Sequence, residues 1–92
     1  MILFPAREKR ILTDSLTIPG YVVTLARCFW THQIWESPHF RVQVCRANGI
    51  ALYVDTLPAG MSEERARWVA VNHLRMTAAL DLLQNERRQN AA

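Results

Sequence analysis

The alternation of hydrophobic and polar positions predicts strands in the middle of the chain. Residues 21–35, YVVTLARCFWTHQIW, are rich in β-branched and aromatic residues and contain no Gly or Pro, which favours one long strand. Residues 39–46 and 50–56 alternate at period two, as strands with one buried face do. Proline-containing breaks at 36–38 and 57–60 separate these segments from each other and from the C-terminal third of the chain.

The join between the last two strands determines which side chains share a face. The dipeptide NG at 48–49 is typical of a two-residue hairpin turn, but that turn would put the apolar positions of the two strands on opposite faces. A three-residue loop over 47–49 instead places Val44 opposite Leu52 and unites the apolar positions on one face. We therefore predict the three-residue loop, with Gly49 in the left-handed region as a bulge.

A single long helix is predicted at the C-terminal end, over residues 62–88. No Gly or Pro occurs there, and Ser62 suits the N-cap position. The helix dipole favours acidic side chains in the first turn and basic ones in the last. The sequence follows this rule, with Glu63 and Glu64 at the start and Arg87 and Arg88 at the end.

The large apolar residues of this helix fall into two stripes on roughly opposite sides when successive residues are placed 100° apart. One stripe consists of Val69, Met76, Leu80 and Leu83, with Ala66 at its edge, and the other of Val71, Leu74, Ala78 and Leu82. A small sheet covers only one of them. We therefore expect the second stripe, through Val71, Leu74 and Leu82, to contact another protein chain.

These elements predict an α+β fold in a single domain, residues 1–92. It consists of an N-terminal segment 1–19, an antiparallel β-meander of three or four strands within 20–57, and one long C-terminal α-helix packed on the sheet. Two alternatives stay open for the N-terminal segment, an edge strand or a helical turn, and Ile-Pro-Gly at 18–20 predicts a turn. A chain of 92 residues leaves apolar surface uncovered, so we expect a homodimer.

Composition narrows the class of protein. Half of the residues are hydrophobic and 21% are charged, which is typical of a globular domain. The opening apolar run MILF is too short for a secretion signal or a membrane span, so we expect a cytoplasmic protein without membrane contact. The two Cys are expected to stay reduced in that compartment.

The sequence carries few signals of chemistry. Cys28, His32, His39 and Cys45 have zinc-compatible side chains, but their spacing lacks the close pairs of a structural zinc site. The three Gly stand apart and form no phosphate-binding loop. No nucleophile is accompanied by a base and an acid at a recognisable spacing. We therefore expect no metal, no cofactor and no enzymatic activity.

A nucleic-acid-binding protein is the alternative function. The net charge is +3 with ten Arg, and Arg contacts phosphates well, although a codon bias toward Arg gives the same composition. Arg41 is predicted on the outward sheet face near Tyr53, and such a face holds single strands by stacking and phosphate contact. The element order over 21–84 is similar to that of the double-stranded-RNA-binding domain. The helix here begins with SEERAR, where that family has a Lys-rich start, so the family's function is not carried over.

An aromatic stretch at 29–40, FWTHQIWESPHF, adds candidate partner contacts. Trp30 and Trp35 differ in parity, so a regular strand places them on opposite faces and at most one of them in the core. We predict a small non-catalytic protein-binding module, an inhibitor or adaptor of the kind that phages and mobile elements encode. Its predicted partner-binding residues are Trp30, Trp35, Arg41, Tyr53, Val71, Leu74 and Leu82.

Overall fold

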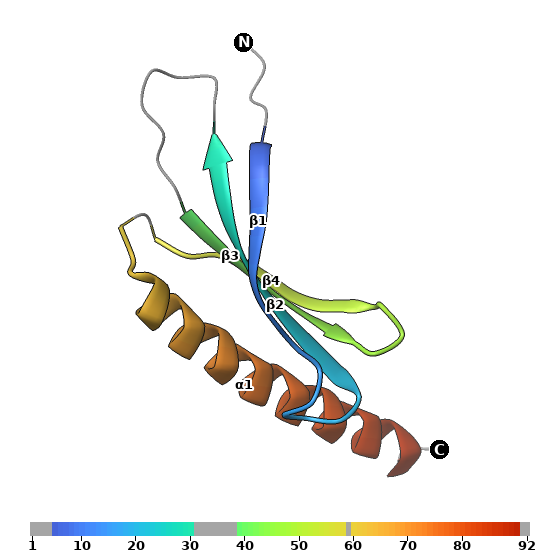
Figure 1. The fold of residues 1–92 in the computed structure, drawn as a ribbon. Helices are drawn as coiled ribbons and strands as arrows, with labels where there is room; N and C mark the ends of the chain where they lie inside the picture. The colour runs from blue at the N-terminus through green and yellow to red at the C-terminus, as the bar shows by residue number, and fades with distance from the viewer. Residues whose placement is uncertain (1–4, 31–38, 59, 91–92) are drawn as a thin grey trace.

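The structure has two layers, a four-stranded antiparallel sheet and one long helix that lies along one face of it (Figure 1). It is a computed structural model that describes residues 5–30, 39–58 and 60–90. The strands lie side by side in chain order and are β1 (Pro5–Asp14), β2 (Tyr21–Trp30), β3 (His39–Arg46) and β4 (Ala51–Thr56). The helix is α1 (Glu63–Asn90). This architecture confirms the predicted α+β class, with four strands.

The segment that the sequence left open forms the edge strand β1. It pairs with β2 in antiparallel register, and Pro5, which cannot donate to a ladder, stands at its first position. The predicted turn before β2 is confirmed, since the amide of Tyr21 donates to the carbonyl of Ile18 at 3.2 Å. Gly20 has a φ of 90° in this turn, a value that favours glycine.

The loop between β3 and β4 has the predicted three residues, 47–49. The amide of Gly49 donates to the carbonyl of Arg46 at 2.9 Å, and Gly49 has a φ of 93°. The amide of Arg46 donates to the carbonyl of Ile50, also at 2.9 Å, which closes the hairpin. The prediction of a left-handed Gly49 is therefore confirmed.

The register beyond this loop differs from the predicted one. Cys45 pairs with Ala51, whereas Val44 pairs with Tyr53, so β4 contains one extra residue, a bulge at Leu52. The predicted pairing of Val44 with Leu52 is therefore wrong. A one-residue shift exchanges the two faces of a strand, and Tyr53 consequently lies on the side of the sheet that faces α1.

The contacts of Tyr53 give a physical reason for the bulge. Its ring stacks on the ring of His73 in α1, with centroids 4.6 Å apart, and its hydroxyl donates to Asp55 at 3.1 Å. Val54 points outward instead and is 55% exposed. An aromatic ring buries more apolar area than a valine side chain, so this register favours contact between β4 and the helix.

The hydrophobic core lies between the sheet and α1. Residues of β2 and β3 that face the helix are paired directly with each other, Val23 with Val44 and Leu25 with Val42. All four side chains are fully buried. The helix packs mainly on these two central strands.

The side of α1 that packs on the sheet is a ridge of small residues. Ala66, Ala70, Leu74 and Ala78 recur at every fourth position and are at most 1% exposed. The small side chains of the three alanines let the helix backbone come close to the strands. The ridge that docks on the sheet combines Ala66, from the edge of the first predicted stripe, with Leu74 and Ala78 from the second. Leu74 belongs to the core, so its predicted role as a partner contact is wrong.

The start of α1 is the predicted one. The Oγ of Ser62 accepts a hydrogen bond from the amide of Arg65 at 3.2 Å, which confirms the N-cap. The charges complement the helix dipole at both ends, with Glu63 and Glu64 in the first turn and Arg87 and Arg88 in the last.

A buried carboxylate holds the C-terminal half of α1 on the sheet. Asp81 is 6% exposed and accepts hydrogen bonds from the hydroxyl of Tyr21 at 2.7 Å and from Nε and Nη2 of Arg46 at 3.0 and 2.6 Å. The Arg46 and Tyr21 donors lower the pKa of Asp81 to about 2. Burial and the Asp81 carboxylate raise the pKa of Tyr21. These three residues form the Asp81 clamp, which fixes the position of α1 along β2 and β3.

Candidate functional site

The outward side of α1 carries large hydrophobic side chains that no described part of the chain covers. Trp68 is 63% exposed, Met76 61%, Leu80 59% and Leu83 44%. These four residues form the outer α1 face. The outward side of a helix in a small monomeric protein is ordinarily polar, so several large apolar side chains exposed on one side mark a candidate interaction site.

Charged groups accompany the outer α1 face near both of its ends. Near its start, the guanidinium of Arg65 lies over the ring of Trp68, 5.8 Å from the centroid. A hollow of about 420 Å³ lies beside them, lined also by Ser62 and Glu64. Near its end, Glu86 is exposed. Arg65 and Glu86 thus flank the hydrophobic side chains, next to the acidic residues of the first turn and the basic residues of the last.

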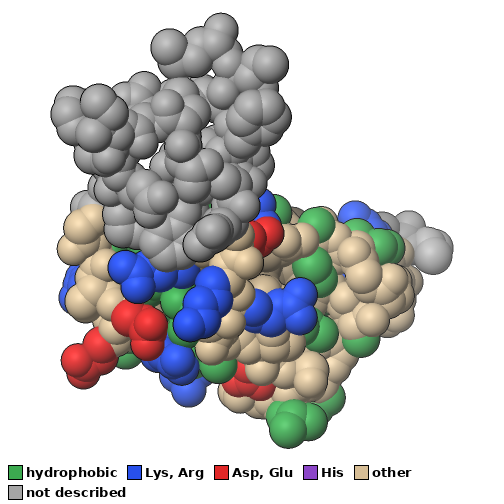
Figure 2. Space-filling view, turned by 45° about the horizontal axis from the view of Figure 1, so that its top comes forward, with side chains coloured by type: hydrophobic (Ala, Val, Ile, Leu, Met, Phe, Trp, Pro, Cys, Tyr) green, Lys and Arg blue, Asp and Glu red, His purple; other side chains and the backbone are tan. Residues whose placement is uncertain are grey.

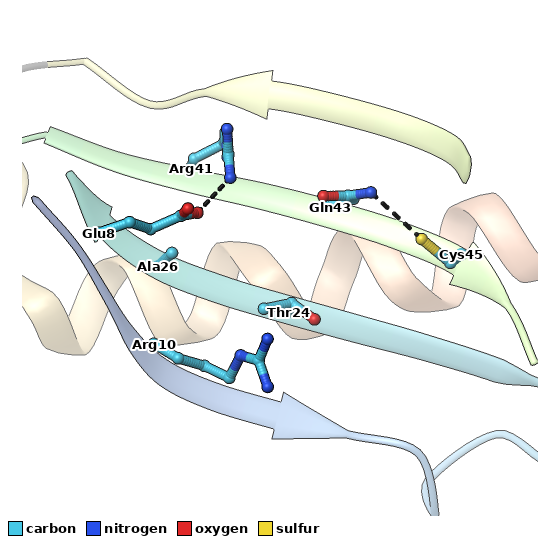
Figure 3. A pocket seen from close by; sticks show the side chains of 7 residues that line it. All are labelled: Glu8, Arg10, Thr24, Ala26, Arg41, Gln43 and Cys45. Carbon is cyan, nitrogen blue, oxygen red and sulfur yellow. Dashed lines mark hydrogen bonds and ion pairs between the residues drawn. The ribbon is translucent and has the colours of Figure 1, made fainter. Parts of the chain in front are cut away.

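The face of the sheet that points away from α1 holds a second candidate surface (Figure 3). A hollow of about 470 Å³ lies over β1, β2 and β3. The outer sheet face consists of its lining residues Glu8, Arg10, Thr24, Ala26, Arg41, Gln43 and Cys45. Ala26 forms the floor, and both neighbouring strands place an arginine opposite it, Arg10 in β1 and Arg41 in β3. Glu8 reaches over β2 to form an ion pair with Arg41.

The polar groups of the outer sheet face are only partly engaged. Arg41 is held by Glu8, whereas Arg10 has no hydrogen bond or ion pair with another described side chain. The amide of Gln43 donates to the sulfur of Cys45 at 3.4 Å, and sulfur is a weak acceptor. On the face that Figure 2 shows, Lys and Arg side chains lie near one another with Asp and Glu among them. The hollow therefore offers donors to an anion, with one acidic group nearby.

The predicted partner contacts divide between these surfaces and the interior. Arg41 lies in the outer sheet face, on the outward side as predicted. Tyr53, which was predicted beside it, lies on the opposite side under α1 because of the bulge, so this prediction is wrong. Leu82 is 54% exposed and Val71 is half-buried, and both belong to a flank of α1.

Two aromatic side chains that the sequence predicts as partner contacts lie outside the part of the chain that the structure describes. Trp35 lies outside the described residues, and so does the side chain of Trp30, whose backbone ends β2. The fully buried Leu74 has no surface left for a partner. The strongest hydrophobic surface among the described residues is therefore one that the sequence prediction did not select.

The signal that could have identified this surface is the spacing of small residues. Alanine at positions 66, 70 and 78 marks the side of α1 that approaches the sheet. Met76, Leu80 and Leu83 of the first stripe are left outside, whereas Val69 packs partly against the core. Trp68 belongs to neither predicted stripe, because a single aromatic residue carries no periodic signal.

The three candidate metal ligands that the structure describes, Cys28, His39 and Cys45, do not converge on one point. Cys28 and His39 pair directly with each other across β2 and β3, whereas Cys45 pairs with Val22 at the other end of these strands. Six strand residues separate the two positions, which corresponds to about 20 Å. Burial raises the pKa of the Cys28 thiol, which disfavours the thiolate form. His32, the fourth candidate ligand, lies outside the described residues.

Comparison with known proteins gives no relative. No family model, no curated protein and no solved structure matches this chain. The helix that the structure describes is not apolar enough to cross a membrane. The two surfaces are therefore interpreted from their own chemistry.

Proposed function

We propose that the protein is a small non-catalytic protein-binding module, an inhibitor or adaptor, with the outer α1 face as its contact surface. The observation that carries this proposal is the exposure of four large hydrophobic side chains along one side of α1. Full burial of such a side chain contributes about 1.5–3 kcal/mol. A partner that covers this face therefore gains affinity without any change in the fold.

The polar groups support a binding role over a catalytic one. The Asp81 clamp joins the helix to the sheet, and its carboxylate is already occupied by three donors. The ion pair between Glu8 and Arg41 joins β1 to β3 across β2. Both cysteines are free, and the buried Cys28 suits a structural residue in a reducing, cytoplasmic compartment.

Capture from an extract of the native host tests this proposal. A tagged chain is incubated with the extract and an excess of untagged chain, and bound proteins are quantified by mass spectrometry. The double variant Met76→Lys/Leu80→Lys removes apolar contact from the outer α1 face. Val54→Lys is the matched control, because Val54 is similarly exposed (55%) but lies on the other face of the sheet.

We expect the captured amount of at least one bound protein to fall about tenfold or more in the double variant and to stay unchanged in the control. Circular dichroism of both variants checks that the fold is retained. The proposal is overturned if every bound protein, the untagged chain included, binds the double variant as well as the control.

Nucleic-acid binding is a second candidate, favoured by the two arginines that flank Ala26 on the outer sheet face. The position of Tyr53 under α1 removes the stacking ring predicted for this surface. Titration with random single-stranded DNA and RNA at about 50 and 200 mM salt tests this function, since phosphate neutralisation makes affinity fall steeply with salt. Arg10→Gln should reduce the slope of log affinity against log salt concentration by about one, which corresponds to the loss of one phosphate contact. Absence of binding at the lower salt concentration would exclude the candidate.

A further inference from the structure

The two ends of the outer α1 face carry different residues, and this difference determines the orientation in which a second helix can pair with it. Arg65 near its start and Glu86 near its end are both exposed and lie 21 residues, or three heptads, apart. A straight helix drifts by about 20° per heptad, so these two residues lie about 60° apart around α1, within one side of the helix. Trp68 and Leu83 lie just inside these charges and are also exposed. The face thus begins with a cation and a large apolar group and ends with a large apolar group and an anion.

A two-fold axis at the middle of α1, beside Met76, makes this face complementary to itself. In two antiparallel helices related by that axis, Trp68 of one copy faces Leu83 of the other. Arg65 of one copy faces Glu86 of the other. Each of these contacts occurs twice, as in any isologous interface.

The parallel arrangement lacks this complementarity. It would bring Arg65 against Arg65 and Glu86 against Glu86, so that like charges meet at both ends. The antiparallel arrangement also opposes the two helix dipoles favourably. The hollow of about 420 Å³ beside Arg65 and Trp68 offers room for Leu83 of the second copy.

We propose that α1 pairs with α1 of a second copy of the chain in this antiparallel two-fold register, with Arg65–Glu86 ion pairs at both ends of the apolar contact. This inference rests on the proposed function, and it identifies the protein partner as a second copy of the chain. The 21 residue steps from Arg65 to Glu86 give a contact about 32 Å long. One helix pair is small for a protein interface, so the dimer forms in a concentration-dependent equilibrium.

Sedimentation velocity over about 10–500 µM tests the register, because it measures association in the range expected for a small interface. The wild-type mass should rise from the 10.6 kDa of one chain toward twice that value. Arg65→Glu and Glu86→Arg each replace two attractive contacts by repulsive ones and should weaken self-association about tenfold. Mixed in equal amounts, the two variants restore both ion pairs and should form a mixed dimer of wild-type affinity.

The design separates association from folding. Both changes place a charge where the helix dipole favours it, so loss of helix stability does not explain a weaker dimer. Arg67→Glu makes the same change of charge near the start of α1 but on another side, where Arg67 pairs with Glu63, and should leave self-association unchanged. Arg75→Gln should tighten the dimer about twofold, because the axis brings two copies of Arg75 together.

A spectroscopic measurement reports on the same contact. In a chain with Trp30→Phe and Trp35→Phe, Trp68 is the remaining Trp, and its emission should shift to shorter wavelength as the dimer forms. Emission that stays unchanged through the association overturns the inference. So does a mixture of the two charge variants that stays monomeric where the wild type dimerises.

A wild-type chain that keeps the mass of one chain at the highest concentration also overturns the inference. The proposed function survives that result if another protein is captured through the outer α1 face. The proposed function itself is overturned if the capture of no bound protein depends on the outer α1 face.

Discussion

The two sides of α1 differ in the size of their hydrophobic residues and in what covers them. The sheet-facing side consists of three alanines and a leucine that are at most 1% exposed, whereas the outward side carries Trp68, Met76, Leu80 and Leu83, each at least 44% exposed. Large hydrophobic residues therefore do not mark the core side of this helix. A helix that lies on a flat sheet gains contact when its backbone comes close, and small side chains permit that approach.

The polar groups of the two sides differ in the same way. On the sheet-facing side, Asp81 is buried and fully engaged with Tyr21 and Arg46. On the outward side, Arg65 and Glu86 are exposed. The first set fixes α1 within its own chain, and the second remains able to fix a helix from another chain.

The largest expected difference between the two sides comes from truncation of leucine. Leu74→Ala should lower the free energy of unfolding by about 2–5 kcal/mol, since it leaves a cavity under the helix. Leu80→Ala, the matched change on the outward side, should alter it by less than about 0.5 kcal/mol. Urea unfolding at a concentration where the chain is monomeric measures both. Equal losses in the two variants would contradict the assignment of the buried side.

Enlargement of alanine should give the next largest difference. Ala70→Leu should cost about 1–3 kcal/mol of unfolding free energy, because the added side chain separates α1 from β2 and β3. Ala79→Leu on the exposed side should leave unfolding nearly unchanged and should tighten self-association, because it adds apolar area to the contact. If Ala70→Leu unfolds like the wild type, close approach of the helix is not what docks it.

The smallest expected effect concerns the contribution of Asp81 to stability, and it is seen only at acidic pH. The folded-state pKa of Asp81 is about 2, below its ordinary value of 3.8, so its contribution to stability is present above pH 3.8 and is lost as pH falls through about 2. Asp81→Asn should remove this part of the pH dependence of urea unfolding between pH 4 and 2. An Asp81→Asn variant with the full wild-type acid dependence would contradict the role of the clamp.

Local signals in the sequence were sufficient for the elements of the fold. The β-branched runs, the turn at Gly20, the left-handed Gly49 and the N-cap at Ser62 all depend on residues near one another in the chain. The order of those elements then left few ways to build an antiparallel sheet with a helix on one face. The β-meander and the C-terminal helix could be predicted from these features.

The orientation of the side chains depended on contacts between distant residues. One bulge in β4 moved Tyr53 under the helix, where it meets His73, and no local pattern announces that exchange. The docked side of α1 was set by how closely the helix could approach β2 and β3, together with the contact of Asp81 with two strands. Sequence periodicity identifies apolar stripes, but only packing against the sheet determines which stripe is covered, because the gain depends on the shapes of both surfaces.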